Sequence, residues 1–314
     1  MIQLVIDNEL QLKTPILMVD EFQDLTTQMF KTIEMWSRNC KKVIIAGDPN
    51  QSIYGFFGGS PDYFINWEAE ETTLPETYRL TDQMVRYSQN VLKVAGMKVP
   101  DIIAVKNNSN SVFSIQHNTL LPTFDTEFHL VRCNYQIYNK KSGVAFELAR
   151  QGKVFSDWTK KEIDLANAII SIRNGYSEWS PQMGRAVMEA FPQIKDYDKR
   201  FDILKSLDPT KNMVYTGDLF KAKMNGIKDR KTLITEEEVN SREILTIHAA
   251  KGSEADAVFL HTGITKRIKR MLITPGKEMK AEARVWYVGA TRAKKALYIV
   301  EDRGENYSMP VVTC

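Results

Sequence analysis

Two polar stretches near the amino terminus have the residue types and spacing needed for phosphate chemistry. Asp20 and Glu21 directly follow the apolar run 16–19, and the polar stretch 48–51 follows a second apolar run at 43–46. The carboxyl ends of parallel strands are where open α/β sheets bind their ligands. There, one acid can hold a magnesium ion while its neighbour takes a proton from an attacking water. Either stretch alone would suit a solvated strand end, but both together favour a hydrolytic site.

The elements that must position these side chains can be read from local signals. Thr26 or Thr27 can cap a helix over residues 28–38, which returns the chain to the second apolar run at 42–46. The strand, the helix and the second strand together form a βαβ unit. The sequence therefore predicts a parallel sheet in which the apolar run before Asp20 is a buried strand and the polar stretches lie at the strand ends.

Five motifs follow one another along the chain. They are Asp-Glu-Phe-Gln-Asp at 20–24, Gly-Asp-Pro-Asn-Gln-Ser-Ile-Tyr at 47–54, Leu-Pro-Glu-Thr-Tyr-Arg at 74–79, Thr-Ile-His-Ala-Ala-Lys-Gly-Ser-Glu at 246–254 and Tyr-Val-Gly-Ala-Thr-Arg-Ala at 287–293. In this order they resemble the Walker B motif, motif III, the Asn-Tyr-Arg box, motif V and motif VI of superfamily 1 helicases of the UvrD/PcrA/Rep type. The resemblance extends from residue 16 to residue 300, and the stretch 155–240 carries no motif of the family.

The resemblance and the chemistry of the side chains together imply a role in ATP hydrolysis for five residues. Asp20 would hold Mg²⁺ through water, and Glu21 would orient and deprotonate the attacking water. Gln51 would sense the γ-phosphate. Arg79 and Arg292 would neutralise the charge that develops on the transferred phosphoryl group, a task that suits a planar guanidinium. Either arginine alone would better fit a surface ion pair, so these two roles rest on the motifs.

Two further residues resemble contacts to the nucleoside. Tyr78 resembles the family tyrosine that stacks on adenine, and Glu254 resembles the motif V glutamate that binds the ribose. ATP and Mg²⁺ are therefore the expected cofactors.

Aromatic residues beside Gln51 form a candidate platform for single-stranded DNA. Such DNA is bound by stacking on aromatic rings and by contacts to its backbone, and Tyr54, Phe56 and Phe57 closely follow Gln51. The family usually has Trp-Arg in place of Phe56-Phe57. An aromatic ring for stacking is still present in this sequence, but the contact that the arginine makes is lost. Core packing is the alternative for both phenylalanines. His248 resembles the motif V histidine near the DNA backbone, although a lone histidine at a strand end is more often structural.

A phosphate-binding loop of the form Gly-x-x-x-x-Gly-Lys-[Ser/Thr] is absent from the 314 residues. The pair Gly276-Lys277 has Met271 in place of the first glycine and Glu278 in place of the hydroxyl residue. In the family this loop and the DNA-contacting motif Ia precede the Walker B strand. In this sequence only 15 residues stand before that strand. We therefore expect the carboxyl-terminal part of a helicase, either truncated or completed by a separate chain that carries the phosphate loop.

Composition favours a cytoplasmic protein with more than one domain and no membrane partner. With 314 residues and 43% hydrophobic content, the chain can bury a large core. No apolar run reaches membrane-spanning length, and the amino terminus lacks a signal-peptide pattern. Cys40, Cys133 and Cys314 are odd in number and scattered, which predicts no disulfide framework. A zinc site is also not expected, because the four histidines do not combine with these cysteines in the spacing of zinc ligands. The histidines are His117, His129, His248 and His261.

Charge is unevenly distributed along the chain, although the net charge is only +3. Residues 1–75 contain 5 Lys and Arg and 11 Asp and Glu. The remaining residues contain 37 Lys and Arg and 28 Asp and Glu. A basic carboxyl-terminal portion suits a partner with a phosphate backbone. Its densest basic run, 266–270, is short enough to be a solvated loop.

The predicted fold is α/β, with two RecA-like lobes in which parallel sheets are flanked by helices. The first lobe, residues 1–75, would be incomplete. The second would consist of residues 76–154 and 241–314, interrupted by a helical insertion over residues 155–240, which is much smaller than the accessory domain of UvrD-type enzymes. Strands of the second lobe are expected at 112–116, 127–132, 243–248, 256–261 and 296–300. Helices are expected after Ser60-Pro61, from Thr81 to near Gly96, up to Gly152, after the capping box Thr159–Glu162 and over 278–293.

Two functions of different classes fit these observations. The first is an ATP-driven DNA helicase or translocase, moving 3′→5′ along single-stranded DNA as its relatives do. The second is a non-hydrolysing nucleic-acid-binding or regulatory module that kept the fold after losing the phosphate loop. A binding-only module has no chemical need for all five ATPase residues, so their presence favours the first function: Asp20, Glu21, Gln51, Arg79 and Arg292.

Overall fold

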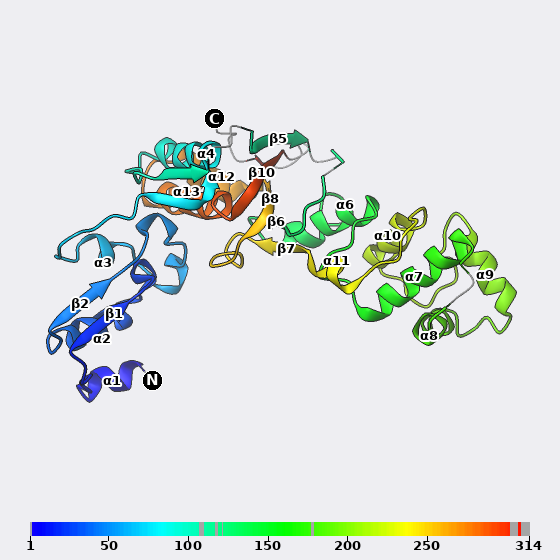
Figure 1. The fold of residues 1–314 in the computed structure, drawn as a ribbon, viewed down its shortest axis with the longest axis horizontal. Helices are drawn as coiled ribbons and strands as arrows, with labels where there is room; N and C mark the ends of the chain where they lie inside the picture. Colours follow the sequence, from blue (N-terminus) through cyan, green and yellow to red (C-terminus); the bar gives the residue numbers. More distant parts are fainter. Residues whose placement is uncertain are drawn as a thin grey trace. The chain divides into compact units, whose positions relative to one another are not determined.

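The computed structural model describes residues 2–106, 110–116, 119–120, 122–176, 179–301 and 307–308. The chain folds into two compact units. Unit 1 comprises the residues up to Val112 together with Thr265–Arg292, and unit 2 comprises Phe113–Ile264 and Ala293–Ser308. Figure 1 traces the order of the elements along the chain.

Unit 1 begins with the predicted strand–helix–strand unit. Its first elements are α1 (Ile2–Asp7), β1 (Ile16–Val19), α2 (Thr27–Ser37) and β2 (Lys42–Ile45). β1 and β2 pair in parallel, with Met18 opposite Ile44. The hydroxyl of Thr26 caps α2 by accepting a hydrogen bond from the backbone N–H of Met29. The βαβ unit and its cap are thus confirmed.

An aromatic cluster covers one face of this small sheet. Phe22 is fully buried, with its ring centroid 5.3 Å from that of Trp67, and Phe30 stacks on Tyr63 at 4.3 Å. Tyr63 lies on α3 (Asp62–Ile65), the short helix expected after Ser60-Pro61. The cluster holds α2 and α3 against the buried face of β1.

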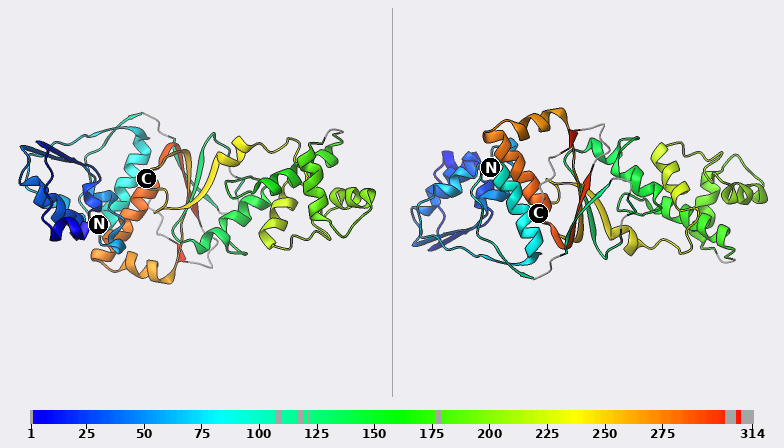
Figure 2. Two further views of the ribbon diagram at one scale, coloured as in Figure 1. Left: turned by 90° about the horizontal axis from the view of Figure 1, so that it is seen from below. Right: turned by 90° about the horizontal axis from the view of Figure 1, so that it is seen from above.

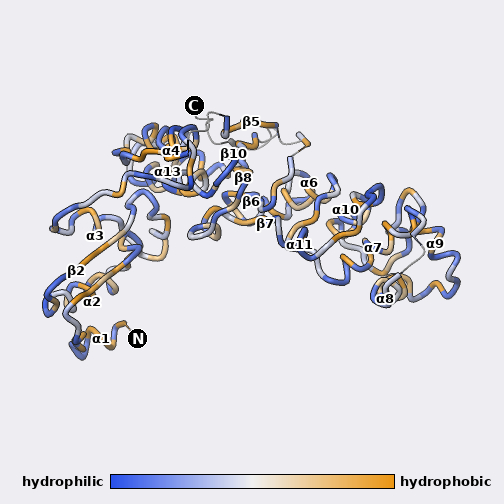
Figure 3. The backbone as a smooth tube through the Cα atoms, viewed as in Figure 1, coloured by the Kyte–Doolittle hydropathy of each residue, from blue (hydrophilic) through white to orange (hydrophobic). Residues whose placement is uncertain are grey.

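The other face of the β1–β2 sheet is exposed, so the expectation of a buried strand is wrong. Leu17 is buried, whereas Met18 is 71% exposed and Ile16 is 50% exposed. Parallel strands are ordinarily covered on both faces, and Figure 3 shows both strands coloured mainly hydrophobic. Apolar composition predicted burial, but burial depends on covering elements, which the described residues provide on one face only.

The remaining elements of unit 1 include the helix that carries motif VI. They are β3 (Glu76–Thr81), α4 (Asp82–Val94), β4 (Ile103–Lys106), α12 (Lys266–Ile273) and α13 (Lys277–Ala290). β3 pairs in parallel with β4, and α13 packs against α4 and α12. Thr81 caps α4 as predicted. The basic run 266–270 forms most of α12, so the expectation of a loop there is wrong.

Unit 2 is built on a five-stranded sheet. Its strands are β5 (Val112–Gln116), β6 (Glu127–Val131), β7 (Arg242–Thr246), β8 (Ala255–His261) and β10 (Ala293–Glu301). The order is β5-β10-β8-β6-β7, and β10, β8, β6 and β7 run in parallel. All residues of β6 and β8 are buried, as expected for the centre of a parallel sheet. The five predicted strands are confirmed.

Helices make up most of the rest of unit 2. They are α5 (Tyr135–Tyr138), α6 (Val144–Arg150), α7 (Lys160–Asn174), α8 (Pro181–Ala190), α9 (Tyr197–Lys205), α10 (Asp218–Gly226) and α11 (Glu236–Asn240). The predicted capping box is present, with Thr159 and Glu162 each accepting from the other's backbone N–H. α7 packs against α8 and α9, and α6 against α10. Figure 2 shows α7–α10 as a group beyond the sheet of this unit.

The α/β class, with parallel sheets flanked by helices, is confirmed. The proposed lobe boundaries at residues 75, 154 and 240 remain a prediction; the structure groups residues 76–112 with those that precede them. Residues 302–306 and 309–314 of the expected closing segment lie outside the described residues. In the described part of the chain, no helix has the length and apolar character needed to cross a membrane.

Candidate active site

The two acids of the first motif directly follow β1 and adopt an unusual backbone. Glu21 has φ 51° and ψ 37°, in the left-handed region that residues with a side chain rarely occupy. Its backbone N–H donates to Oδ1 of Asp20 at 2.8 Å, and its Oε2 accepts from Nε2 of Gln23 at 2.5 Å. Both acids are exposed. The turn therefore presents two adjacent carboxylates at the strand end.

Gln23 ties this turn to the loop after β2. Its Oε1 accepts a hydrogen bond from the backbone N–H of Asp48 at 3.1 Å, while its Nε2 holds Glu21. A Cβ at Gly47 would lie only 2.1 Å from Oε1 of Gln23, so this close approach requires glycine. Gln23 was not predicted as a site residue, although its position inside the first motif was an available signal.

Asp48 organises the 3₁₀ turn Pro49–Gln51. Its Oδ1 accepts from the backbone N–H of Asn50 at 2.9 Å, and its Oδ2 accepts from Nε2 of Gln51 at 3.0 Å. The hydroxyl of Tyr287, on α13, donates to the same Oδ2 at 3.3 Å. One carboxylate thus orients the Gln51 amide and links the turn to α13. Asp48 and Tyr287 were also missed, because their partnership depends on tertiary structure.

Arg292 lies just beyond α13 and contacts Gln51 directly. It is 3% exposed, and its Nη2 donates to Oε1 of Gln51 at 3.3 Å and to Oγ1 of Thr291 at 3.0 Å. Its Nε donates to the carbonyl of Val288 at 3.0 Å. The structure therefore brings together two predicted site residues that are 241 positions apart in the sequence.

Burial and nearby acids raise the pKa of two tyrosines of this region. The pKa of Tyr287 is raised far above its ordinary value, first by burial and then by the charge of Asp48 and its hydrogen bond. The pKa of Tyr54 is raised by burial and by the charges of Asp24 and Glu21. Both hydroxyls therefore stay protonated to a higher pH than an ordinary tyrosine hydroxyl does.

Tyr78 and Arg79 occupy successive positions of β3. Tyr78 is 68% exposed, and its hydroxyl donates to Oε2 of Glu76 at 2.8 Å. Arg79 is half-buried, and successive strand side chains point to opposite faces. The exposed ring of Tyr78 can therefore stack on a base.

The three aromatic residues after Gln51 form a cluster in which both phenylalanines are exposed and Tyr54 is half-buried. Phe56 and Phe57 are 67% and 71% exposed, with ring centroids 4.3 Å apart. The ring of Tyr54 lies 6.3 Å from that of Phe56. Because both phenylalanines are exposed, the core-packing alternative is wrong.

Two family models match the chain, one in its amino-terminal part and one in its carboxyl-terminal part. The UvrD/REP helicase N-terminal domain matches residues 4–71, and the UvrD-like helicase C-terminal domain matches residues 187–303. Together these segments make up more than half of the chain. The chain belongs to the UvrD-like helicase family. The resemblance inferred from the five motifs is thereby confirmed.

Known helicases of this kind are similar to most of the chain at low identity. A probable DNA helicase of Mycoplasma pneumoniae is 24% identical over 93% of the chain and 44% of its own length. A probable DNA helicase II homolog of Mycoplasma capricolum subsp. capricolum is 22% identical over 92% of the chain and 55% of its own length. A shorter part of the chain resembles the ATP-dependent DNA helicase UvrD2 of Mycobacterium tuberculosis, which is 32% identical over 26% of the chain and 13% of its own length. The chain thus spans about half the length of the two relatives that match most of it.

The two site residues predicted from helicase motif V lie in unit 2. His248 is half-buried in the turn after β7. Glu254 precedes β8, and its side chain is 41% exposed and 3.7 Å from Nζ of Lys294. Glu254 is therefore accessible to a ligand.

The acids after β1 fit the way helicases of this family would use Mg²⁺. This ion is held by one or two carboxylates together with phosphates and water, which Asp20 can satisfy. Within the described residues, no group of three or more His, Cys, Asp or Glu could hold a metal ion. Cys40 and Cys133 are not joined in a disulfide within the described residues, and Cys314 and His117 lie outside them.

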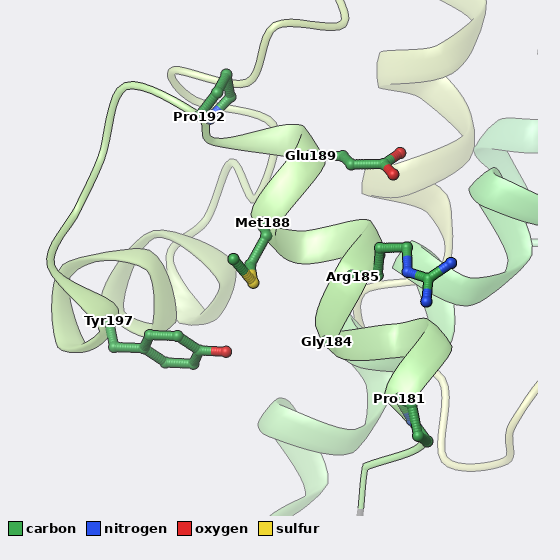
Figure 4. Close-up of a pocket in the computed structure, with 7 residues that line it drawn as sticks. All are labelled: Pro181, Gly184, Arg185, Met188, Glu189, Pro192 and Tyr197. Atoms are coloured by element: carbon green, nitrogen blue, oxygen red, sulfur yellow. The ribbon is translucent and has the colours of Figure 1, made fainter.

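A groove in the helical part of unit 2 includes none of the helicase motif residues. Its volume is about 630 Å³, and α8 and α9 contribute most of its wall (Figure 4). Its lining residues are Pro181, Gly184, Arg185, Met188, Glu189, Pro192 and Tyr197. We assign no role in the ATPase chemistry to this groove.

Proposed function

We propose that this chain is the carboxyl-terminal part of an ATP-dependent DNA helicase or translocase, coupling ATP hydrolysis to 3′→5′ movement on single-stranded DNA. The hydrogen bond between Gln51 and Arg292 carries the proposal. It links a γ-phosphate sensor to an arginine finger. The rings of Tyr54, Phe56 and Phe57 follow within the next six residues, and both phenylalanines are exposed. The nucleotide sensor and the stacking surface would therefore move together.

The carboxylates after β1 would perform the hydrolytic step. Mg²⁺, when bound with ATP, supplies neutralisation of charge on the β- and γ-phosphates. Asp20 would hold that ion through water. Glu21 would take a proton from the water that attacks the γ-phosphate, and Gln23 fixes the carboxylate for this task.

The two arginines would act on the charge of the transferred phosphoryl group. Arg292 donates to the neutral amide oxygen of Gln51, and a phosphate oxygen accepts a stronger, charge-assisted hydrogen bond. A bound γ-phosphate would therefore take the guanidinium from Gln51. Arg79 would contribute the second positive charge. Tyr78 would stack on adenine and Glu254 would bind the ribose.

Movement on DNA would follow from the change at Gln51. Release from Arg292 would let the turn Pro49–Gln51 adjust, and Tyr54 lies three residues further along the chain. The cluster of exposed rings would stack on bases with little regard to their identity. His248 would add a contact to the DNA backbone.

Hydrolysis by this machinery needs a phosphate loop, which the 314 residues do not contain. That loop supplies the backbone N–H cradle, the lysine and the magnesium-binding hydroxyl. We propose that a segment or separate chain carrying the loop completes the site, and that the chain alone does not turn over ATP. The same missing motif favours the alternative, a non-hydrolysing nucleic-acid-binding module.

The test measures ATP hydrolysis with saturating single-stranded DNA and magnesium for the chain alone and for the chain fused behind a helicase segment that carries the phosphate loop. We expect turnover only in the fusion, and a loss on the order of 10³-fold in Arg292→Ala of the fusion. No turnover in a folded, nucleotide-binding fusion would favour the binding module. Turnover by the chain alone that disappears in Glu21→Gln would show that no loop is needed.

A further inference from the structure

Helix α12 is strongly basic on its exposed side. Lys266, Arg267, Lys269 and Arg270 are all exposed. Residues three or four positions apart are neighbours on a helix. Lys266 therefore lies beside Lys269 and Arg270, and Arg267 beside Arg270, so that the cations form one surface.

The positive charge continues into the start of α13. Lys277 and Lys280 are also exposed. Residues 265–281 thus contain six Lys and Arg, and Glu278 is the single acid among them. A surface of this density attracts polyanions.

The arrangement opposes the stability of the helix that carries it. Lys266 and Arg267 lie in the first turn, where the helix dipole is already positive, and like charges four positions apart repel. Within the described residues, no acidic side chain forms an ion pair with Lys266, Arg267 or Arg270. Violations of local preference are expected at functional surfaces.

The apolar side of α12 is occupied by the protein's own fold. Ile268 is 5% exposed, and α12 packs against α13; Figure 2 shows α12, in light orange, joined to α13 by a short turn. A helix that binds a membrane surface keeps its apolar face available for lipid. Only Ile273, at the end of α12, is an exposed large apolar residue of this helix. The surface therefore suits a partner recognised by charge alone.

We infer that α12 is a docking surface for the phosphate backbone of duplex DNA. The inference rests on the proposed function, because it takes DNA as the partner. Residues 265–281 contain no aromatic side chain, so this surface lacks the aromatic platform on which single-strand sites stack bases. A duplex turns its bases inward and its phosphates outward, and cations can contact it without reading its sequence.

The experiment titrates the whole chain with a blunt duplex of about 20 base pairs at several salt concentrations, because each phosphate that a cation neutralises contributes to the salt dependence. The test variant is Lys266→Gln/Arg270→Gln. The control is Lys199→Gln/Lys205→Gln, which removes the same charge from exposed positions of α9. We expect the slope of log affinity against log salt to fall by roughly 0.9 for each phosphate that is no longer neutralised, about 1.8 in the test variant, and to stay unchanged in the control.

The inference would be overturned by an unchanged slope in the test variant, by an equal decrease of the slope in the control, or by no binding of duplex by the parent chain. Stronger binding of the parent to anionic phospholipid vesicles than to duplex would overturn it in favour of a membrane partner. Thermal melting checks the fold of each variant, and Arg267→Gln serves as a second variant should the first unfold.

Phe56→Ala separates this inference from the proposed function. Titrated with single-stranded DNA, this variant tests the stacking surface and leaves α12 intact. Weakened single-strand binding in Phe56→Ala with an unchanged duplex slope in the α12 variant would remove only the inference. The reverse result would keep α12 as a duplex contact and remove the stacking step.

Discussion

Glu21 is held in the left-handed region by its surroundings. A residue with a side chain in such a conformation costs on the order of 1–3 kcal/mol, which the rest of the site must offset. Gln23, 1% exposed, does so by bonding both the Glu21 carboxylate and the backbone of Asp48. The motif indicated the two acids as site residues, and their roles remain a prediction. It could not predict Gln23, whose second partner lies 25 positions later.

The first prediction concerns this carboxylate in the enzyme completed with a phosphate-loop segment. Glu21→Gln should keep nucleotide binding and lower turnover by roughly 10²–10⁴-fold, because the amide cannot accept the proton of the attacking water. ATP hydrolysis and nucleotide affinity are measured on the same preparation. A matched change, Glu34→Gln on the exposed side of α2, should leave turnover unchanged. Equal turnover in both variants would remove Glu21 from the reaction.

The second prediction concerns the exposed ring of Phe56. Phe56→Ala should weaken binding of single-stranded DNA by roughly 1–3 kcal/mol with little dependence on base identity. Because the ring is 67% exposed, the melting temperature should barely change, and because stacking is not ionic, the salt slope should stay the same. DNA titration and thermal melting of one variant check both statements. A large loss of stability with unchanged affinity would argue for a packing role.

At the scale of elements, local signals predicted the strands and helices, and their burial was not predictable. Thr26, Thr81 and Thr159 each cap the helix expected from the sequence, because a cap needs only its neighbours along the chain. Met18 and Ile16 are exposed despite their apolar side chains, since covering a sheet face takes elements from elsewhere. The basic run at 266–270 shows the converse: α13 supplies the packing that makes it a helix.

Pairing between β6 and β7 buries an ion pair that the sequence did not reveal. Arg242 lies opposite Glu127 and holds it through Nε to Oε2 at 2.6 Å and Nη2 to Oε1 at 3.0 Å. Both side chains are almost fully buried. Strand register alone brings these two residues, 115 positions apart, into contact.

The third prediction follows from that burial. Arg242→Met should lower the free energy of unfolding by about 3–5 kcal/mol, because it leaves the Glu127 carboxylate buried without a partner. Glu127→Gln/Arg242→Met should recover much of the loss, since no isolated charge remains. Urea unfolding of the two variants and the parent gives the comparison. Equal losses in both variants would assign the effect to packing.

At the scale of the whole molecule, the fold brings distant residues together and divides the chain in a way that no motif predicts. Gln51 and Arg292 are in contact although 241 positions separate them, and their roles at a nucleotide remain a prediction. The division into units places residues 265–292 with the amino-terminal part and residues 293–308 with the five-stranded sheet. Such a division depends on packing among all elements, and no local pattern encodes it.

The central sheet of unit 2 also ties the stability of the molecule to pH. Burial lowers the pKa of His129 to about 4, although the nearby Glu127 carboxylate, 3.6 Å away, opposes the shift. Burial alone would raise the pKa of Glu127, but its contacts with His129 and Arg242 outweigh this and lower it to about 2. Nδ1 of His129 also lies 3.3 Å from Nε2 of His261, and the His129 ring stacks on Phe259. Both shifted groups lie where protonation would disrupt packing.

The last prediction is that acid destabilises the protein in two steps. Unfolded His129 binds a proton near pH 6.5 and folded His129 near pH 4, so its stabilising contribution is complete above 6.5 and falls by on the order of 1.4 kcal/mol per pH unit toward 4. Glu127 adds a second loss as pH falls from about 4.5 toward 2. Urea unfolding from pH 8 to pH 4 measures the first step. His129→Phe, which keeps the stack on Phe259, should flatten the curve between pH 6.5 and 4, and parallel curves for parent and variant would refute the assignment to His129.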